Sequence, residues 1–247
     1  MSKAGKNERA WELNFCCQIS FLTKYNFMKK IIFSIAGLIV LSLTTVSVRA
    51  QYVSIGPSAG VGLSWISLDE SGFDQQSHVL WNAGATFVYS TESHFGFGAD
   101  LKFSQEGYKI SYQVSEVTYE SNVNMNYLRL PLRFIYFFGD YGNAIRPKIF
   151  IGPTPGILLS AKSNTDPGAS VDAKNTFNSF DLGIHAGAGI NFRLAERVWL
   201  NTDVTYYHGL LDATDDDVNG DENNFNRNLG LNVGLAFGFG PSHQKEK

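Results

Sequence analysis

The chain has 247 residues, of which 44% are hydrophobic, and it carries a formal net charge of −3 at pH 7. No apolar run of 18 or more residues follows residue 50, which excludes a transmembrane helix in the body of the chain. The 24 glycines and the 30 Phe and Tyr residues favour a β-rich barrel or sandwich.

Residues 28–50 have the layout of a Sec signal peptide. A Met-Lys-Lys n-region precedes the apolar stretch IIFSIAGLIVLSLTTV, and the Val-Arg-Ala motif at 48–50 supplies small residues at positions −3 and −1. We therefore expect export and a mature chain that begins at residue 51. Because a signal peptide starts at its n-region, we expect Met28 to be the true start and residues 1–27 to be a mis-called extension. The alternative keeps residues 1–27 and makes the apolar run an uncleaved anchor.

Cleavage would change both the cysteine content and the charge of the protein. Cys16 and Cys17 are the only cysteines, so the mature chain would have none, and disulfides, thiol catalysis, cysteine metal sites and a lipoprotein anchor would be excluded. The mature chain would carry 13 basic and 21 acidic residues, a net charge of −8. This acidic balance predicts no nucleic-acid partner.

The mature chain shows eight segments in which apolar and polar residues alternate, as in strands with one apolar face. They lie at residues 53–66, 80–90, 95–104, 128–136, 148–157, 180–192, 198–207 and 229–239. Pro153 and Pro155 cannot donate ladder hydrogen bonds, so we expect a bend or bulge there. The connection at 105–124 could itself be extended strand above a membrane surface.

The connections between these strands alternate between long and short. Short periplasmic turns, long external loops and an even number of strands are typical of outer-membrane barrels. We therefore predict an all-β fold, an eight-stranded antiparallel transmembrane β-barrel over residues 51–240, with a periplasmic tail at 241–247. A soluble lipocalin-like barrel or a β-sandwich would share the alternation. Aromatic residues near the strand ends, and polar faces rich in both glycine and charge, favour the membrane barrel.

Charged side chains on the polar faces would lie in the lumen of such a barrel. They are Asp100, Lys102, Arg129, Arg133, Lys148, Asp181, His185 and Asp203. An eight-stranded barrel is only wide enough for side chains to fill, so we expect these charges to pair and plug the lumen. The alternative is a proton or small-ligand path that involves His185.

The acidic stretch DDDVNGD at residues 215–221 matches the pattern of a calcium-binding loop. Its oxygen ligands would come from Asp215, Asp217, Asn219 and Asp221. The twelfth position is Asn226 in place of the usual Glu, and no helices are predicted on either side. Calcium is therefore a candidate ligand, and the alternative is a solvated acidic loop with no cofactor.

The mature chain contains no recognisable catalytic motif, and we predict that it is not an enzyme. Its five histidines include no pair at metal-ligand spacing, and no G-x-S-x-G motif is present. Small barrels can be lipid-modifying hydrolases. For that alternative His208, beside the fourth long loop, is the only candidate residue.

Several stretches resemble the PorT-like outer-membrane β-barrel family of Bacteroidetes. They are NYLRLPLRFIYFFG at 126–139, IRPKIFIGPTPGILLSAK at 145–162, the strand DLGIHAGAGINF at 181–192 and YHGLL at 207–211. The resemblance implies a Sec-exported protein of the Gram-negative outer membrane with a structural or interaction role linked to secretion, of type IX in some members, or to envelope assembly. The implied partners are outer-membrane lipid, the barrel insertion machinery and proteins of a secretion complex.

Overall fold

The computed structural model describes residues 53–67, 74–91, 93–114, 117–140, 143–166, 170–214 and 224–239. Its elements are β1 (Val53–Ser67), β2 (Asp74–Ser90), β3 (Phe95–Val114), β4 (Val117–Arg129), β5 (Leu132–Phe137), β6 (Ile145–Asp166), β7 (Ser170–Asp172), the 3₁₀ helix η2 (Lys174–Thr176), β8 (Phe180–Ala195), β9 (Val198–Gly209) and β10 (Phe225–Phe239). Within these ranges no helix is long and apolar enough to cross a membrane. The predicted extension, signal peptide and tail lie outside the described residues.

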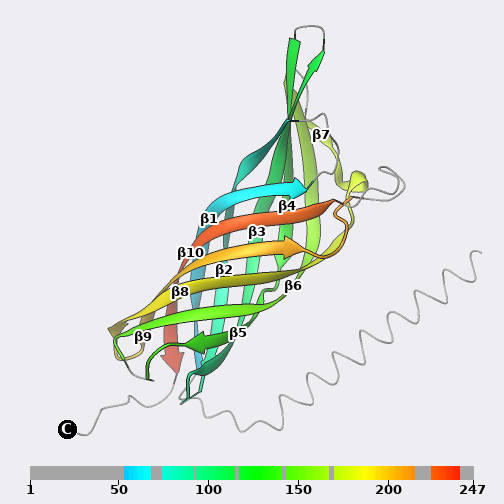
Figure 1. Cartoon of the computed structure of the whole chain (residues 1–247). Coiled ribbons are helices and arrows are strands. Elements are labelled where there is room, and N and C mark those ends of the chain that lie inside the picture. The colour runs from blue at the N-terminus through cyan, green and yellow to red at the C-terminus, as the bar shows by residue number, and fades with distance from the viewer. Residues whose placement is uncertain are drawn as a thin grey trace, which may run out of the picture. The chain divides into compact units, whose positions relative to one another are not determined.

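One antiparallel sheet closes on itself to form a barrel (Figure 1). β1 pairs with β2 on one side and with β10 on the other, so the first and last strands complete the ring. β4 and β5 occupy a single place in the wall, because both pair with β3 and with β6. Counted in this way, the wall has eight strands, and the predicted eight-stranded antiparallel barrel is confirmed.

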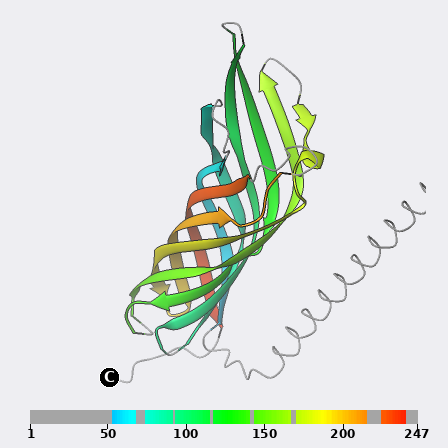
Figure 2. The ribbon, with the colours of Figure 1, turned by 45° about the vertical axis from the view of Figure 1, so that its right-hand side comes forward.

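Four strands, β2, β3, β4 and β6, continue well beyond the lengths predicted for them. β3 has 20 residues and β6 has 22, whereas a tilted strand needs only about 9–11 to cross a bilayer. β3 and β4 remain paired out to Val114 and Val117, so the predicted connection at 105–124 is a long β-hairpin. Figures 1 and 2 show this hairpin standing above the closed part of the barrel. The apolar alternation of the sequence ends before the backbone pairing of β3 with β4 does.

The bend or bulge expected at the two prolines of the fifth strand is found at one edge of that strand only. Pro153 and Pro155 of β6 pair with β8 without any shift in register. On the opposite edge of β6 the register shifts near Asn126 of β4, and the wall strand is interrupted at Leu130 and Pro131. Leu130 N donates to the carbonyl of Pro155 at 2.9 Å, so the backbone polar groups of Pro155 point towards this interruption. The N–H groups that the two prolines lack would therefore have faced the interruption and not β8.

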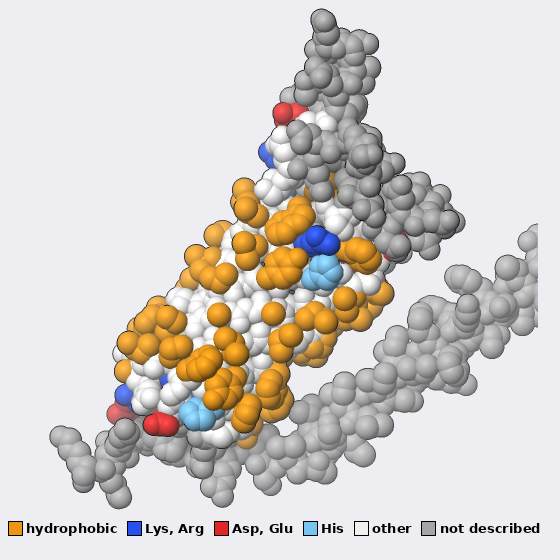
Figure 3. All heavy atoms as spheres, in the orientation of Figure 1, with side chains coloured by type: hydrophobic (Ala, Val, Ile, Leu, Met, Phe, Trp, Pro, Cys, Tyr) orange, Lys and Arg blue, Asp and Glu red, His pale blue; other side chains and the backbone are white. Residues whose placement is uncertain are grey.

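The two faces of the wall have opposite character. Outward-facing side chains are apolar and exposed, such as Val61 at 58% and Ile151 at 54%, whereas Ser64 on the inner face is 4% exposed. The space-filling view shows this apolar cover along the barrel (Figure 3). Such an inside-out distribution is what a membrane barrel requires, and a soluble barrel would bury its apolar face instead.

Inward-facing glycines allow close contact between neighbouring strands. A Cβ at Gly152 of β6 would lie 1.9 Å from the carbonyl oxygen of Leu132 in β5, so the backbone of one strand would have to move. At Gly230 of β10 the nearest atom would be the Thr205 hydroxyl oxygen at 3.5 Å, an ordinary contact. The need for glycine is therefore specific to the position.

We predict that Gly152→Ala lowers the free energy of unfolding by about 1–3 kcal/mol, because overpacking forces a backbone shift. Gly230→Ala is the matched control on the same face and should unfold close to wild type. Urea unfolding of the barrel in lipid vesicles, followed by tryptophan fluorescence, measures both. Equal stability of the two variants would contradict this account of the glycine positions.

Candidate functional site

The lumen is the candidate site, because the barrel places there all eight side chains predicted for it. Seven of them are buried residues, and the side chain of Lys102 is 12% exposed. The structure adds Glu106 and Arg146, which are both buried on the same inner face. Both lie just outside the predicted strands. Glu106 continues the alternation of Lys102 on β3, and Arg146 continues that of Lys148 on β6, so a longer strand assignment would have included them.

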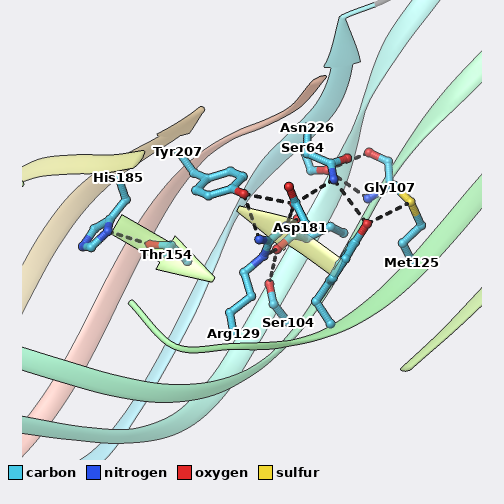
Figure 4. Close-up of polar contacts among 12 residues, drawn as sticks. Ser64, Ser104, Gly107, Met125, Arg129, Thr154, Asp181, His185, Tyr207 and Asn226 are labelled. Carbon is cyan, nitrogen blue, oxygen red and sulfur yellow. Dashed lines mark hydrogen bonds and ion pairs between the residues drawn. The ribbon is translucent and has the colours of Figure 1, made fainter. Parts of the chain in front are cut away.

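Arg129 holds the cluster near the outer end of the lumen (Figure 4). Its Nε lies 2.6 Å from Oε1 of Glu106 and its Nη2 lies 2.7 Å from Oε2, a bidentate pair. Nη2 also lies 2.8 Å from Oδ2 of Asp181. The guanidinium carbon is 4.4 Å from the ring centroids of both Tyr127 and Tyr207. Four residues distant in sequence are thus joined through one cation.

Arg133 holds a second cluster closer to the periplasmic end. Its Nη2 donates to Oδ1 of Asp100, and its Nη1 lies 3.4 Å from Oδ2 of Asp203. Lys148 Nζ lies 2.9 Å from the other oxygen of Asp203, and Lys102 Nζ lies 3.4 Å from Asp100. Each carboxylate in this cluster therefore contacts two cations.

Together the two clusters are neutral. The outer cluster has one cation and two carboxylates, and the inner cluster has three cations and two carboxylates. Buried ions are tolerated only when they are paired, so the excess negative charge of one cluster balances the excess positive charge of the other. This arrangement has the chemistry of a plug, since the cations and carboxylates of the two clusters compensate one another.

Apolar side chains close the lumen beyond each charged cluster. The outer apolar cluster consists of Ile66, Tyr108, Val123, Met125, Tyr127, Leu158, Ala161, Phe177 and Ala213. The inner apolar cluster consists of Val88, Ile135, Phe137 and Phe150. Two members of the outer cluster, Phe177 and Ala213, come from the external segments that follow β7 and β9 and are joined by backbone bonds. Apolar side chains therefore lie in the lumen on both sides of the charged clusters.

A small cavity remains between the two charged clusters. Its volume is about 70 Å³, enough for a few water molecules but far below the roughly 300–1,000 Å³ of a small-molecule site. His185 lines it, with Nδ1 2.7 Å from the Thr154 hydroxyl, and its Nε2 has no hydrogen-bond partner among the described residues. A proton or ligand path through His185 would have to pass Phe150 of the inner apolar cluster, whose ring lies 5.7 Å from that of His185.

The predicted calcium ligands Asp215, Asp217, Asn219 and Asp221 lie outside the described residues. The two ends of this loop are joined, because Ala213 N donates to the Asn224 carbonyl at 2.8 Å. Asn226, the twelfth position of the motif, points into the lumen and donates to Asp181 at 3.0 Å. It is therefore not placed to act as a calcium ligand. Within the described part of the chain, no group of three acidic or histidine side chains could hold a metal ion.

His208, the residue considered for hydrolase chemistry, lies on the outward face of β9. Its ring lies 6.5 Å from that of Tyr206 and 6.2 Å from that of Phe225, measured between centroids. No hydrogen bond links it to a Ser or Asp in the part of the chain that the structure describes. The geometry thus gives His208 an aromatic, lipid-facing setting.

Comparisons with known proteins point to one family. A family model described as "Outer membrane protein beta-barrel domain" matches residues 47–215. No curated protein matches the chain. Among solved structures, the chain is similar to the outer membrane protein OprG of Pseudomonas aeruginosa, with 14% identity, 78% of this chain and 98% of that chain covered, and a TM-score of 0.49. It is also similar to the attachment invasion locus protein Ail of Yersinia pestis, with 13% identity, 75% and 99% covered, and a TM-score of 0.39.

We predict that Arg129→Gln lowers the free energy of unfolding by about 3–5 kcal/mol, because Glu106 and Asp181 would be left as buried, uncompensated charges. The double variant with Glu106→Gln should recover part of this loss. Arg197→Gln, in an exposed periplasmic turn, is the matched control and should change stability by less than about 0.5 kcal/mol. Urea titration in lipid vesicles gives all three values. If the losses in free energy of unfolding from Arg129→Gln and Glu106→Gln simply add in the double variant, the two residues are not coupled, which would contradict the pairing.

Proposed function

This chain belongs to the outer membrane protein beta-barrel domain family, and from that premise we propose that it is a sealed barrel that presents an interaction surface to a protein partner. It is an integral β-barrel protein of the outer membrane of Gram-negative bacteria. The proposed role is structural and non-enzymatic. Its resemblance to PorT-like barrels supports a partner within a secretion or envelope-assembly complex.

The observation that carries this proposal is the outer sheet, which the barrel does not need in order to span the membrane. Beyond the closed ring, β2, β3, β4, β6 and β7 continue as an open sheet. In the described residues, β7 pairs only with β6, and residues 74–77 of β2 pair only with β3. Open strand edges accept an added strand from another chain, which makes this sheet suited to protein recognition.

The sealed lumen supports the same role. The two charged clusters, which are neutral only when taken together, lie between two apolar clusters, so the interior is used for stability and leaves the outer sheet as the accessible surface. Exposed Val171 of β7, at 62%, lies on one edge of that sheet. An apolar side chain beside an unpaired edge is a feature that a partner strand would cover.

We predict that replacing residues 110–121 by an Asn-Gly turn weakens capture of the partner and leaves the barrel folded, because it removes the residues of β3 that pair with residues 74 and 75 at the open edge of β2. Lys109 and Asn122 face each other in the register, so a two-residue turn can join them and retain Tyr108 and Val123 of the outer apolar cluster. The measurement is crosslinking in native membranes followed by mass spectrometry of the co-purified proteins. Heat-modifiable migration on gels reports whether the barrel has folded.

The matched control replaces the loop at 215–223 with a Gly-Ser linker of equal length. It should retain the partner if the outer sheet is the interaction surface. Loss of the partner in the control, with retention in the hairpin variant, would overturn the assignment of the surface. A steady channel in planar bilayers formed by the wild-type protein would overturn the sealed-lumen part of the proposal.

Calcium capture by the acidic loop is a second candidate function, favoured by the joined ends of the loop. Oδ1 of Asp212 accepts hydrogen bonds from the backbone nitrogens of Thr214 at 2.9 Å and Asn224 at 3.1 Å. This clamp holds together the ends of a segment whose sequence carries five acidic residues at 215–223. A restrained loop loses less conformational entropy on binding an ion.

If this candidate is correct, titration of the refolded barrel with calcium gives a binding heat at millimolar concentrations, and Asp217→Ala removes it. Glu222→Gln is the control, because residue 222 is outside the predicted ligand set and should leave the heat in place. If the wild-type protein shows no binding heat at millimolar calcium, calcium capture by this loop is ruled out.

A further inference from the structure

Arg227 is an unexpected charge on the lipid-facing surface of the barrel. The outward-facing residues of β10 are Phe225, Arg227, Leu229, Leu231, Val233, Leu235, Phe237 and Phe239. β1, β8, β9 and β10 are described along their whole lengths, and Arg227 is the only charged residue among their outward-facing positions before the periplasmic turn. The cation therefore calls for a physical explanation.

The neighbours of Arg227 form a polar and aromatic row across three strands. Arg227 stands opposite Trp65 of β1 and opposite His208 of β9 in the register. Directly opposed residues have Cβ atoms only about 4.5–5.5 Å apart, so all three side chains share one patch. Tyr206 connects the patch, with ring centroids 6.4 Å from Trp65 and 6.5 Å from His208. We call these four residues, with Phe225, the Arg227 patch.

The Arg227 patch lies at the outer limit of the apolar band. Towards the periplasm, the next outward-facing residues of β10 are Leu229 and Leu231, 45% and 52% exposed. Towards the exterior, Phe225 is the only further outward-facing residue of β10, and it is the first residue of the strand. In Figure 3 a basic side chain and a histidine lie next to each other within the apolar surface, towards the outer end. At this depth an arginine can reach the membrane interface with its guanidinium.

No carboxylate balances Arg227 among the described residues. The six ion pairs found there all belong to the lumen. Its Nε is buried and has no hydrogen-bond partner in the same part of the chain. A guanidinium at the boundary between lipid chains and headgroups is best satisfied by an anion located at that boundary.

We propose that the Arg227 patch binds the phosphate of a phosphorylated glycolipid of the outer leaflet, of the lipid A class. The planar guanidinium donates two parallel hydrogen bonds to a phosphate, and His208 supplies a further donor from the neighbouring strand. The acyl chains of the same lipid lie against the exposed side chains of Leu229, Leu231 and Val204. This site is separate from the outer sheet and from the lumen.

The test uses the full barrel in mixed detergent micelles and measures the binding of bisphosphorylated lipid A by native mass spectrometry. Arg227→Gln should weaken binding about tenfold, the loss expected for a charge-assisted hydrogen-bonded contact. Arg227→Lys, which keeps the charge without the bidentate geometry, should lie between that variant and wild type. Arg197→Gln removes one positive charge from the periplasmic end and should bind like wild type. Heat-modifiable migration confirms that each variant is folded.

Two further probes identify the source of the phosphate. Dephosphorylated lipid A should bind about as weakly to wild type as bisphosphorylated lipid A binds to the Arg227→Gln variant. Inorganic phosphate alone should not compete at equal concentration, because it lacks the acyl chains. Equal binding of lipid A by wild type and Arg227→Gln overturns the proposal, as does equal binding of the dephosphorylated lipid. If inorganic phosphate competes at equal concentration, the patch is a site for a free anion, and the proposal of a lipid ligand is overturned.

Discussion

The structure depends above all on the pairing of Arg129 with Glu106 and Asp181 inside a ring of only eight strands. Such a ring has no room for a hydrated interior, so every inward side chain must be small, apolar or fully paired. Arg129 meets this requirement with hydrogen bonds of 2.6–2.8 Å to two carboxylates and contacts with two tyrosine rings. These contacts join β3, β4, β8 and β9 across the lumen.

The same requirement explains why the lumen consists of layers. An apolar cluster lies towards each end, and the two charged clusters lie around a cavity of about 70 Å³. Layers of this kind exclude bulk water, which strengthens the ion pairs and also makes them indispensable. A lumen used in this way is a structural core.

Two of those outer surfaces have different physical characters. The outer sheet offers unpaired backbone groups at its edges, and these suit a protein strand. The Arg227 patch offers one cation within aromatic side chains at the edge of the apolar band, which suits a charged lipid headgroup. Both can be occupied at once, because one projects from the membrane and the other faces the lipid.

The sequence by itself determined which way each side chain points, and with it the strand count and the inside-out character of the wall. A period of two residues is a local property, so the inward positions of Asp100, Arg133 and Asp203 could be predicted without any partner. The strand ends could not, because pairing of β3 with β4 outlasts the apolar alternation. Only the tertiary structure decided which inward charges meet. Arg129 pairs with carboxylates 23 and 52 residues away in the sequence. Strand register and barrel closure determine these partners, and both depend on the whole ring of strands.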